Sequence, residues 1–168
     1  IWGTMSPYKG VDKFFEYLEG TGLRDKFNIM LKGKFSDREY YKKLVQMDVK
    51  AEVSDAFASE DELQELMQKS RIILFTYNRD SVLSSGALID SLFAPCFVIG
   101  PDTGAFRDLA SEGLADSYQD FSDLVEKIEK LIRKDISSVM KGRTRFIEEN
   151  GWKKFGHKIS EKLFSLKE

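Results

Sequence analysis

Two serines and a glycine, Ser84, Ser85 and Gly86, lie where a loop meets the expected start of a helix. An apolar run at residues 72–75 precedes the loop, and a second apolar run at residues 96–99 follows the helix. This order predicts a strand–loop–helix–strand unit, in which free backbone N–H groups and the positive end of the helix dipole meet. The pattern indicates an anion site, although a plain helix cap without a ligand would use the same serines.

Two charged residues are candidates to complete this site. Asp90 lies about one turn beyond Gly86, among apolar residues. Its carboxylate either faces solvent, the default for a single aspartate, or accepts hydrogen bonds from paired hydroxyl groups such as those of a ribose. Lys9 follows Pro7 in a loop between the first expected strand and helix, where a lysine suits a phosphate as a point charge. An ordinary surface lysine is the alternative.

A turn of small residues and an aromatic tail are further candidates. Gly104 and Ala105 follow an expected strand, and small residues there let a backbone approach a ligand; a tight turn alone explains them equally well. Trp152 begins a run of aromatic residues at helical spacing, which is typical of a core or a domain interface. His157 lies on the same expected helix, where a structural role is more common than a catalytic one.

Composition limits the class of protein. The chain of 168 residues is one domain by length, with 42% apolar and 32% charged residues and a net charge of −2. No basic field exists to attract nucleic acid. Cys96 is the only cysteine, which excludes an internal disulfide and favours a reducing compartment, the cytoplasm. A single histidine excludes a zinc site built from several histidines and cysteines, and no transmembrane run or signal peptide is visible.

Apolar runs alternate with helical patterns along the whole chain. The expected strands are residues 1–2, 27–31, 49–53, 72–75, 97–99 and 114–118. Expected helices include residues 37–46, a helix capped by a Ser59–Glu62 capping box, residues 106–110 and residues 121–132. Such repeats predict an α/β fold: a Rossmann-like, doubly wound, mostly parallel sheet with helices on both faces. Residues 136–168 form a C-terminal tail of two helices parted near Asn150 and Gly151, and ligands are expected at the carboxyl ends of the strands.

The order of these motifs resembles the C-terminal, nucleotide-sugar-binding half of GT-B glycosyltransferases, specifically the family 4 retaining enzymes. The resemblance covers nearly the whole chain. It implies that residues 1–168 form a single donor-binding domain. It rests on Gly3 with residues 9–12, on residues 29–33, on residues 59–63 with Leu66, on residues 70–77 and on residues 103–109. It implies that the N-terminal acceptor domain is absent from this chain, as the start within an expected strand also suggests.

The resemblance also implies roles for the candidate residues. Lys9 would contact the donor diphosphate and stabilise the charge that develops on it; the catalytic residues proper are unassigned. The residues implied in donor binding are Lys9, Ser84, Ser85, Gly86, Asp90, Gly104 and Ala105. The donor would be a UDP- or GDP-sugar, with no cofactor and no metal. The implied reaction is sugar transfer to an acceptor hydroxyl in bacterial polysaccharide, capsule or lipopolysaccharide biosynthesis, in the cytoplasm or at the inner membrane face.

Three positions depart from the family pattern. Val82 stands where the first of two motif glutamates is expected, Asp90 replaces the second, and Thr4 stands where an arginine often partners the lysine. Two alternatives therefore stay open: a non-catalytic nucleotide-binding or regulatory domain, and a nucleotide-sugar epimerase of the same fold. Nucleotide binding would separate the first from the enzymes, and sugar transfer by the full-length protein would separate transferase from epimerase.

Overall fold

A computed structural model describes residues 1–78, 85–151, 154, 156–157 and 160. Ser84, Val82 and Trp152, which the sequence analysis singled out, lie outside the described residues. Most of the second tail helix falls there too. The first tail helix, α7 (Ser137–Asn150), ends just before Gly151, as the sequence predicts.

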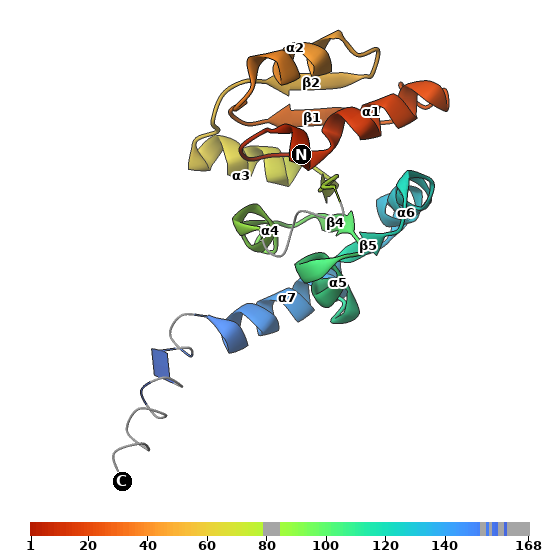
Figure 1. Ribbon diagram of the computed structural model, residues 1–168. Helices are drawn as coiled ribbons and strands as arrows, with labels where there is room; N and C mark the ends of the chain where they lie inside the picture. Colours follow the sequence, from red (N-terminus) through yellow and green to blue (C-terminus); the bar gives the residue numbers. More distant parts are fainter. Residues whose placement is uncertain (79–84, 152–153, 155, 158–159, 161–168) are drawn as a thin grey trace.

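All described strand pairs are parallel, and they form two ladders (Figure 1). The first pairs β1 (Ile29–Lys32) with β2 (Ala51–Ser54). The second has the order β3 (Ile72–Leu74), β4 (Phe97–Pro101) and β5 (Asp116–Tyr118). The N-terminal segment extends the first ladder through two parallel bridges, Trp2 with Lys32 and Met5 with Phe35. The mostly parallel α/β fold is therefore confirmed, with hydrogen-bond pairing divided between two sheets.

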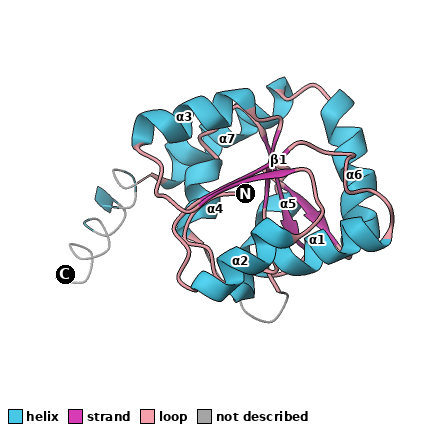
Figure 2. Cartoon of the chain, turned by 90° about the horizontal axis from the view of Figure 1, so that it is seen from above, coloured by secondary structure: helices cyan, strands magenta, loops and turns pink. Residues whose placement is uncertain are grey.

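Helices cover both faces of these strands, as expected for a doubly wound domain (Figure 2). Alternate residues of β4 face opposite sides: Phe97 and Ile99 belong to one hydrophobic cluster, and Val98 belongs to the other. The first cluster contains residues of α1 (Val11–Gly20), α2 (Arg38–Gln46) and α6 (Phe121–Arg133). The second contains residues of α4 (Gly86–Ser91) and α5 (Gly104–Ser111), with Met67 of α3 (Glu60–Lys69) and Phe146 of α7 packed against it.

Local side-chain chemistry explains where several helices begin. Ser59 and Glu62 form the predicted capping box at the start of α3, and Asp37 caps α2 by accepting from two backbone N–H groups. Several expected boundaries were displaced. β1, β2 and β5 each begin two residues later than the apolar patterns that start at Phe27, Val49 and Leu114. The helix α5 begins at Gly104 rather than Phe106. In each case the apolar pattern follows burial, whereas the element is defined by backbone hydrogen bonds.

The apolar residues of α3, Leu63, Leu66 and Met67, lie on its inward face but are only half-buried, and none of the residues of α3 is fully buried. The reason is that they line open grooves beside α3 rather than closed packing. One groove separates α3 from α4, and another separates it from the β1–β2 ladder.

Candidate functional site

The loop that carries Lys9 is fixed against the carboxyl end of β3. Residues Pro7–Lys9 form one turn of 3₁₀ helix, and Gly10 closes it in the left-handed conformation with φ 64°. A Cβ at Gly10 would lie 2.6 Å from the carbonyl oxygen of Thr76, so only glycine fits this approach. The Thr76 hydroxyl donates to the Lys9 carbonyl oxygen at 2.7 Å, and Asn78 N–H donates to the Tyr8 carbonyl oxygen at 3.0 Å. Both bonds tie the loop to the chain that continues β3.

Lys9 is a buried cation, and few protein groups stabilise its charge. Lys9 is 3% exposed, and its Nζ donates to the Trp2 carbonyl oxygen at 3.2 Å. The same Nζ lies 5.3 Å from the centre of the Tyr77 ring. Among the described residues no carboxylate forms an ion pair with it. Burial lowers the pKa of Lys9 to about 8, so its ammonium is mostly charged near pH 7 and would be favoured further by an anion.

Ser85 and Gly86, the described part of the predicted serine motif, lie at the start of α4, next to the tyrosine that contacts this cation. Ser85 is the N-cap of α4: its hydroxyl oxygen accepts from Leu88 N–H at 3.4 Å and lies 3.3 Å from the Tyr77 hydroxyl. Gly86, the first helical residue, is exposed, with open space where a side chain would be. Ser84, the third predicted member, lies outside the described residues.

Gly3 connects the cation and the start of α4. A Cβ on Gly3 would lie 3.2 Å from Lys9 Nζ and 3.8 Å from Ala87 Cβ, so the cation and the first turn of α4 flank the same glycine. Trp2, next to it, accepts from Lys9 through its carbonyl oxygen and donates from its indole Nε1 to the Ser91 hydroxyl of α4 at 3.1 Å. Lys9 and the start of α4, far apart in sequence, are thus brought together.

The turn that contains Gly104 and Ala105 also lies at a strand end. Gly104 has φ 49° and begins α5, directly after β4, and both residues are half-buried. The next residue, Phe106, packs its ring 5.7 Å from the ring of Tyr77. The start of α5 is therefore placed next to the aromatic ring that supports Lys9.

Asp90 occupies a different place. Its side chain is exposed and lines a groove of about 480 Å³ between α3 and α4, together with Leu63, Met67 and Phe93. Among the described residues it has no hydrogen bond or ion pair with Lys9 or Ser85. The structure thus groups Lys9, Ser85, Gly86 and Gly104 around one strand edge and puts Asp90 on the α3 side of α4.

Two features at the carboxyl ends of the strands were not predicted from the sequence. The first is Tyr77, a buried tyrosine that contacts both the Lys9 ammonium and the Ser85 hydroxyl. Its position, two residues beyond an apolar strand, is the signal that could have found it.

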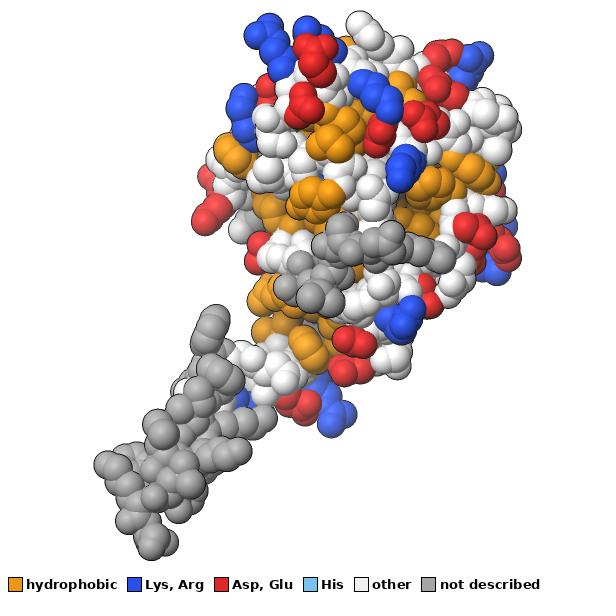
Figure 3. All heavy atoms as spheres, viewed as in Figure 1, with side chains coloured by type: hydrophobic (Ala, Val, Ile, Leu, Met, Phe, Trp, Pro, Cys, Tyr) orange, Lys and Arg blue, Asp and Glu red, His pale blue; other side chains and the backbone are white. Residues whose placement is uncertain are grey.

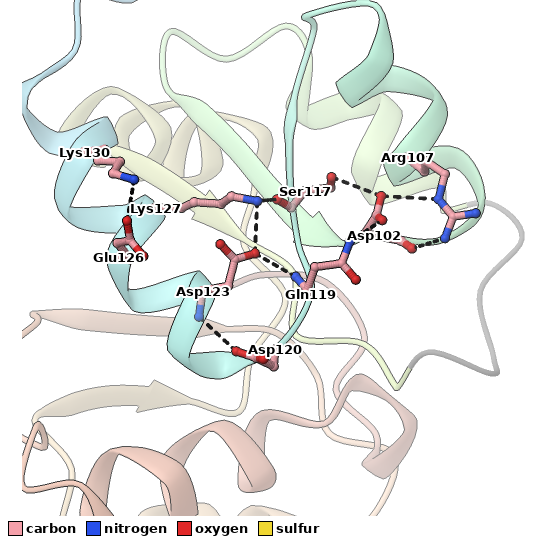
Figure 4. A network of polar contacts seen from close by, with 9 residues as sticks. All are labelled: Asp102, Arg107, Ser117, Gln119, Asp120, Asp123, Glu126, Lys127 and Lys130. Atoms are coloured by element: carbon pink, nitrogen blue, oxygen red, sulfur yellow. Dashed lines mark hydrogen bonds and ion pairs between the residues drawn. The ribbon is translucent and has the colours of Figure 1, made fainter.

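The second is a polar network around Asp102, which directly follows β4 (Figure 4). Its carboxylate accepts from Arg107, Ser117 and Gln119. Asp123 continues the network by accepting from Gln119 N–H and pairing with Lys127. Burial raises the pKa of Asp102, but the bonds from Gln119, Arg107 and Ser117 outweigh it and leave that pKa below its usual value. This paired charge stabilises the turn that leads into α5.

The described part of the chain contains no group of three or more histidine, cysteine, aspartate or glutamate side chains that could hold a metal ion. None of its helices is both long enough and apolar enough to cross a bilayer. On the face drawn in Figure 3, acidic and basic side chains alternate without a field of a single sign.

The architecture as a whole is that of the Rossmann-like C-terminal domain of GT-B proteins. One similar solved structure is the C-terminal domain of a glycosyl transferase group 1 family protein from Francisella tularensis. The identity is 14% and the TM-score 0.64, over 89% of this chain and 83% of that one.

A second similar structure is an alpha,alpha-trehalose-phosphate synthase (UDP-forming) from Burkholderia vietnamiensis. The identity is 10% and the TM-score 0.67, over 99% of this chain but only 44% of that one. No protein-family model matches the sequence, and no curated protein sequence matches it. At these identities the likeness establishes the fold.

Proposed function

We propose that this chain is the donor-binding domain of a GT-B glycosyltransferase that transfers a sugar from a nucleotide-diphosphate sugar to an acceptor hydroxyl. The observation that carries the proposal is the buried ammonium of Lys9, which has no carboxylate partner among the described residues and lies beside the first turn of α4. Of the two similar structures described above, one is named a glycosyl transferase group 1 family protein and the other a UDP-forming trehalose-phosphate synthase. UDP is therefore the first donor nucleotide to test, ahead of GDP.

The proposed reaction exchanges one bond to the sugar for another. The bond between the anomeric carbon and the diphosphate oxygen breaks, the acceptor oxygen bonds to the same carbon, and the acceptor hydroxyl loses its proton. Negative charge grows on the departing diphosphate, and the Lys9 ammonium stabilises that charge in a low-dielectric setting. Because this stabilisation comes from protein groups, we propose that the transfer needs no metal ion.

The other candidate residues receive roles in the same proposal. The hydroxyl groups of Ser84 and Ser85 and the open backbone at Gly86 contact the phosphates and the sugar. Gly104 and Ala105 line the cleft at the start of α5. Asp90 accepts hydrogen bonds from the ribose hydroxyls; its place beside α3 makes it the least direct of these assignments.

The complete enzyme needs a second domain in this proposal. The acceptor site lies on an N-terminal domain, so this chain binds donor nucleotide but transfers no sugar alone. We propose bacterial polysaccharide, capsule or lipopolysaccharide assembly as the pathway, in the cytoplasm or at the inner membrane face, with no nucleic-acid partner. A regulatory nucleotide-binding domain remains the second candidate, because Val82 stands in place of a motif glutamate.

Thermal unfolding in the presence of UDP, GDP, ADP and dTDP tests the proposal. A ligand that binds only the folded chain stabilises it by about 3 kcal/mol at a hundredfold excess over Kd, which raises Tm by roughly 5–10 °C. We expect this shift with UDP or GDP. We expect Lys9→Met to abolish it, Asp90→Ala to reduce it, and Lys13→Met, which removes an exposed lysine of α1, to leave it unchanged.

Equal shifts in Lys9→Met and the wild type would overturn the assignment of the site. No shift with any diphosphate would overturn the donor-binding proposal itself. If the nucleotide binds but the full-length protein transfers no sugar, the regulatory domain or the epimerase replaces the transferase.

A further inference from the structure

Tyr77 lies at the point where all parts of the proposed site meet. Its side chain is buried, and its ring makes edge-to-face contacts with Tyr8 at 5.7 Å, Phe75 at 5.5 Å and Phe106 at 5.7 Å. These three rings come from the Lys9 loop, the end of β3 and α5. A ring held from three sides cannot rotate freely, so its face and its hydroxyl point in fixed directions.

The face of the ring supports the Lys9 ammonium. An aromatic face carries the negative part of the ring quadrupole, and a cation within about 6 Å of its centre is attracted to it. Lys9 Nζ, at 5.3 Å, meets that condition. Since no carboxylate pairs with Lys9 among the described residues, the ring and the Trp2 carbonyl oxygen are the groups that favour its charge.

The described titratable group in contact with the Lys9 ammonium is the phenol of Tyr77, whose ring centre lies 5.3 Å from Nζ. Burial raises the pKa of Tyr77, so its phenol keeps its proton near pH 7.

The hydroxyl of Tyr77 lies within hydrogen-bond distance of the Ser85 hydroxyl. Ser85 Oγ already accepts from Leu88 N–H, and the Tyr77 hydroxyl lies 3.3 Å from the same oxygen. A phenol is the stronger donor of the two hydroxyls, so Tyr77 donates and Ser85 accepts. The hydrogen of Ser85 then stays available for a bond to an anion.

We propose that Tyr77 is the positioning residue of this site: its ring holds the charged Lys9 in place, and its hydroxyl turns the Ser85 hydroxyl into a donor toward the diphosphate. The inference rests on the proposed donor-binding function. It adds that Tyr77 need not touch the ligand itself. Tyr77 sets the charge of Lys9 and the direction of the Ser85 hydroxyl, which are the groups that contact the ligand.

Three variants separate the two effects. Tyr77→Phe keeps the ring and removes the hydroxyl. Tyr77→Leu removes both. Phe15→Leu is the matched control, because Phe15 is a buried ring that packs on Phe14, with no ring contact to Tyr77 and no cation contact in the described chain. Urea unfolding of each variant shows that the domain is folded under the conditions of the other measurements.

The first readout is the titration of Lys9 itself, followed by NMR with isotope-labelled lysine and assigned by the signal missing in Lys9→Met. We expect Tyr77→Leu to lower the midpoint by roughly half a unit to one unit, since a cation–aromatic contact favours the charged form by that amount. Tyr77→Phe and Phe15→Leu should keep the wild-type midpoint. A midpoint in Tyr77→Leu equal to that in Phe15→Leu overturns the role of the ring.

The second readout is the affinity for UDP and GDP from pH 6.5 to pH 9.5. We expect Tyr77→Phe to bind about fivefold more weakly at every pH, the effect of one hydrogen bond. Tyr77→Leu should bind at least about tenfold more weakly, and its loss of affinity above neutral pH should begin at lower pH. Wild-type affinity in Tyr77→Phe overturns the role of the hydroxyl.

The two readouts keep the two proposals apart. If the wild type binds neither nucleotide, the donor-binding function is wrong, and the NMR titration still decides whether Tyr77 controls the charge of Lys9. If the wild type binds and both Tyr77 variants bind equally well, the function stands and the inference about Tyr77 is overturned.

Discussion

Two buried cations lie at opposite ends of the parallel strands, and their surroundings differ. Arg143 of α7 is 1% exposed and reaches the amino ends of β4 and β5. Its Nε donates to the Leu114 carbonyl oxygen at 2.7 Å, and its Nη1 donates to those of Ala94 at 3.2 Å and Cys96 at 2.8 Å. Lys9, at the carboxyl ends, has one carbonyl acceptor and one aromatic ring.

The difference shows how a buried charge can be assigned to structure or to binding. Each carbonyl that Arg143 satisfies belongs to a segment entering a strand, so its guanidinium holds α7 against the sheet. Both cations keep unused donor capacity: Arg143 Nη2 has no hydrogen-bond partner in the described structure, and the Lys9 ammonium has three hydrogens but one carbonyl acceptor. The two differ in what lies around them, because Lys9 lies beside the start of α4, where Gly86 leaves open space, whereas Arg143 lies among the carbonyl oxygens that precede β4 and β5. A protein keeps a charge such as that of Lys9 at a cost in stability when a ligand completes its surroundings.

The largest effect is expected at Arg143. Arg143→Met would leave three carbonyl oxygens without their donor inside the protein, and we expect the free energy of unfolding to fall by roughly 4 kcal/mol. Urea unfolding measures the change. Arg145→Met is the control, since Arg145 lies on the same helix in an exposed i,i+4 pair with Glu149, and its removal should change the stability much less than that of Arg143. Equal loss in both variants would show that α7 depends on surface charge instead.

At Lys9 we expect substitution to change the free energy of unfolding in the opposite direction, toward greater stability. Because burial lowers the pKa of Lys9 from 10.5 to about 8, the charged form costs the folded state about 3 kcal/mol at pH 7. Lys9→Met should therefore be more stable than the wild type by up to that amount, whereas Lys13→Met should not be.

The stability gain of Lys9→Met should also depend on pH. Between pH 8 and pH 10.5 the unfolded chain binds more protons than the folded chain, so wild-type stability rises with pH through this range. The advantage of Lys9→Met should then shrink by roughly 2 kcal/mol between pH 7 and pH 9.5 in paired urea titrations. An advantage that is constant with pH would mean that Lys9 is not a desolvated charge.

Local patterns in the sequence predicted most of the fold. Alternating apolar runs and helical periodicity gave the order of the elements, and short-range chemistry gave the Ser59–Glu62 capping box. The starts of β1, β2, β5 and α5 were less accurate, because apolar residues outside a strand or inside a helix follow the same pattern as the element itself. These errors come from reading the apolar pattern in place of backbone hydrogen bonds.

Long-range contacts explain what the sequence could not give at the site. Lys9 was a candidate by residue type and by its place after a strand, but its burial depends on Trp2 and Tyr77, and Tyr77 is nearly seventy residues away in sequence. Arg143 was not predicted, although Val139, Met140, Phe146 and Ile147 at i−4, i−3, i+3 and i+4 place it on the apolar face of its helix. The carbonyls that it meets are defined only when the strands pair.

The smallest effect is expected at Asp102, which lies at the same strand edge as Lys9 but is fully engaged by Arg107, Ser117 and Gln119. If paired charges are structural, Asp102→Asn should cost about 1 kcal/mol at pH 7 and leave nucleotide affinity unchanged. Since its pKa is lowered in the folded state, this contribution is present at neutral pH and is lost as the pH falls below about 4. Urea unfolding at pH 7 and pH 3.5 measures the difference, and UDP titration at pH 7 measures binding. A large loss of affinity in Asp102→Asn would break the comparison, because a charge satisfied within the protein would then also be part of the binding site.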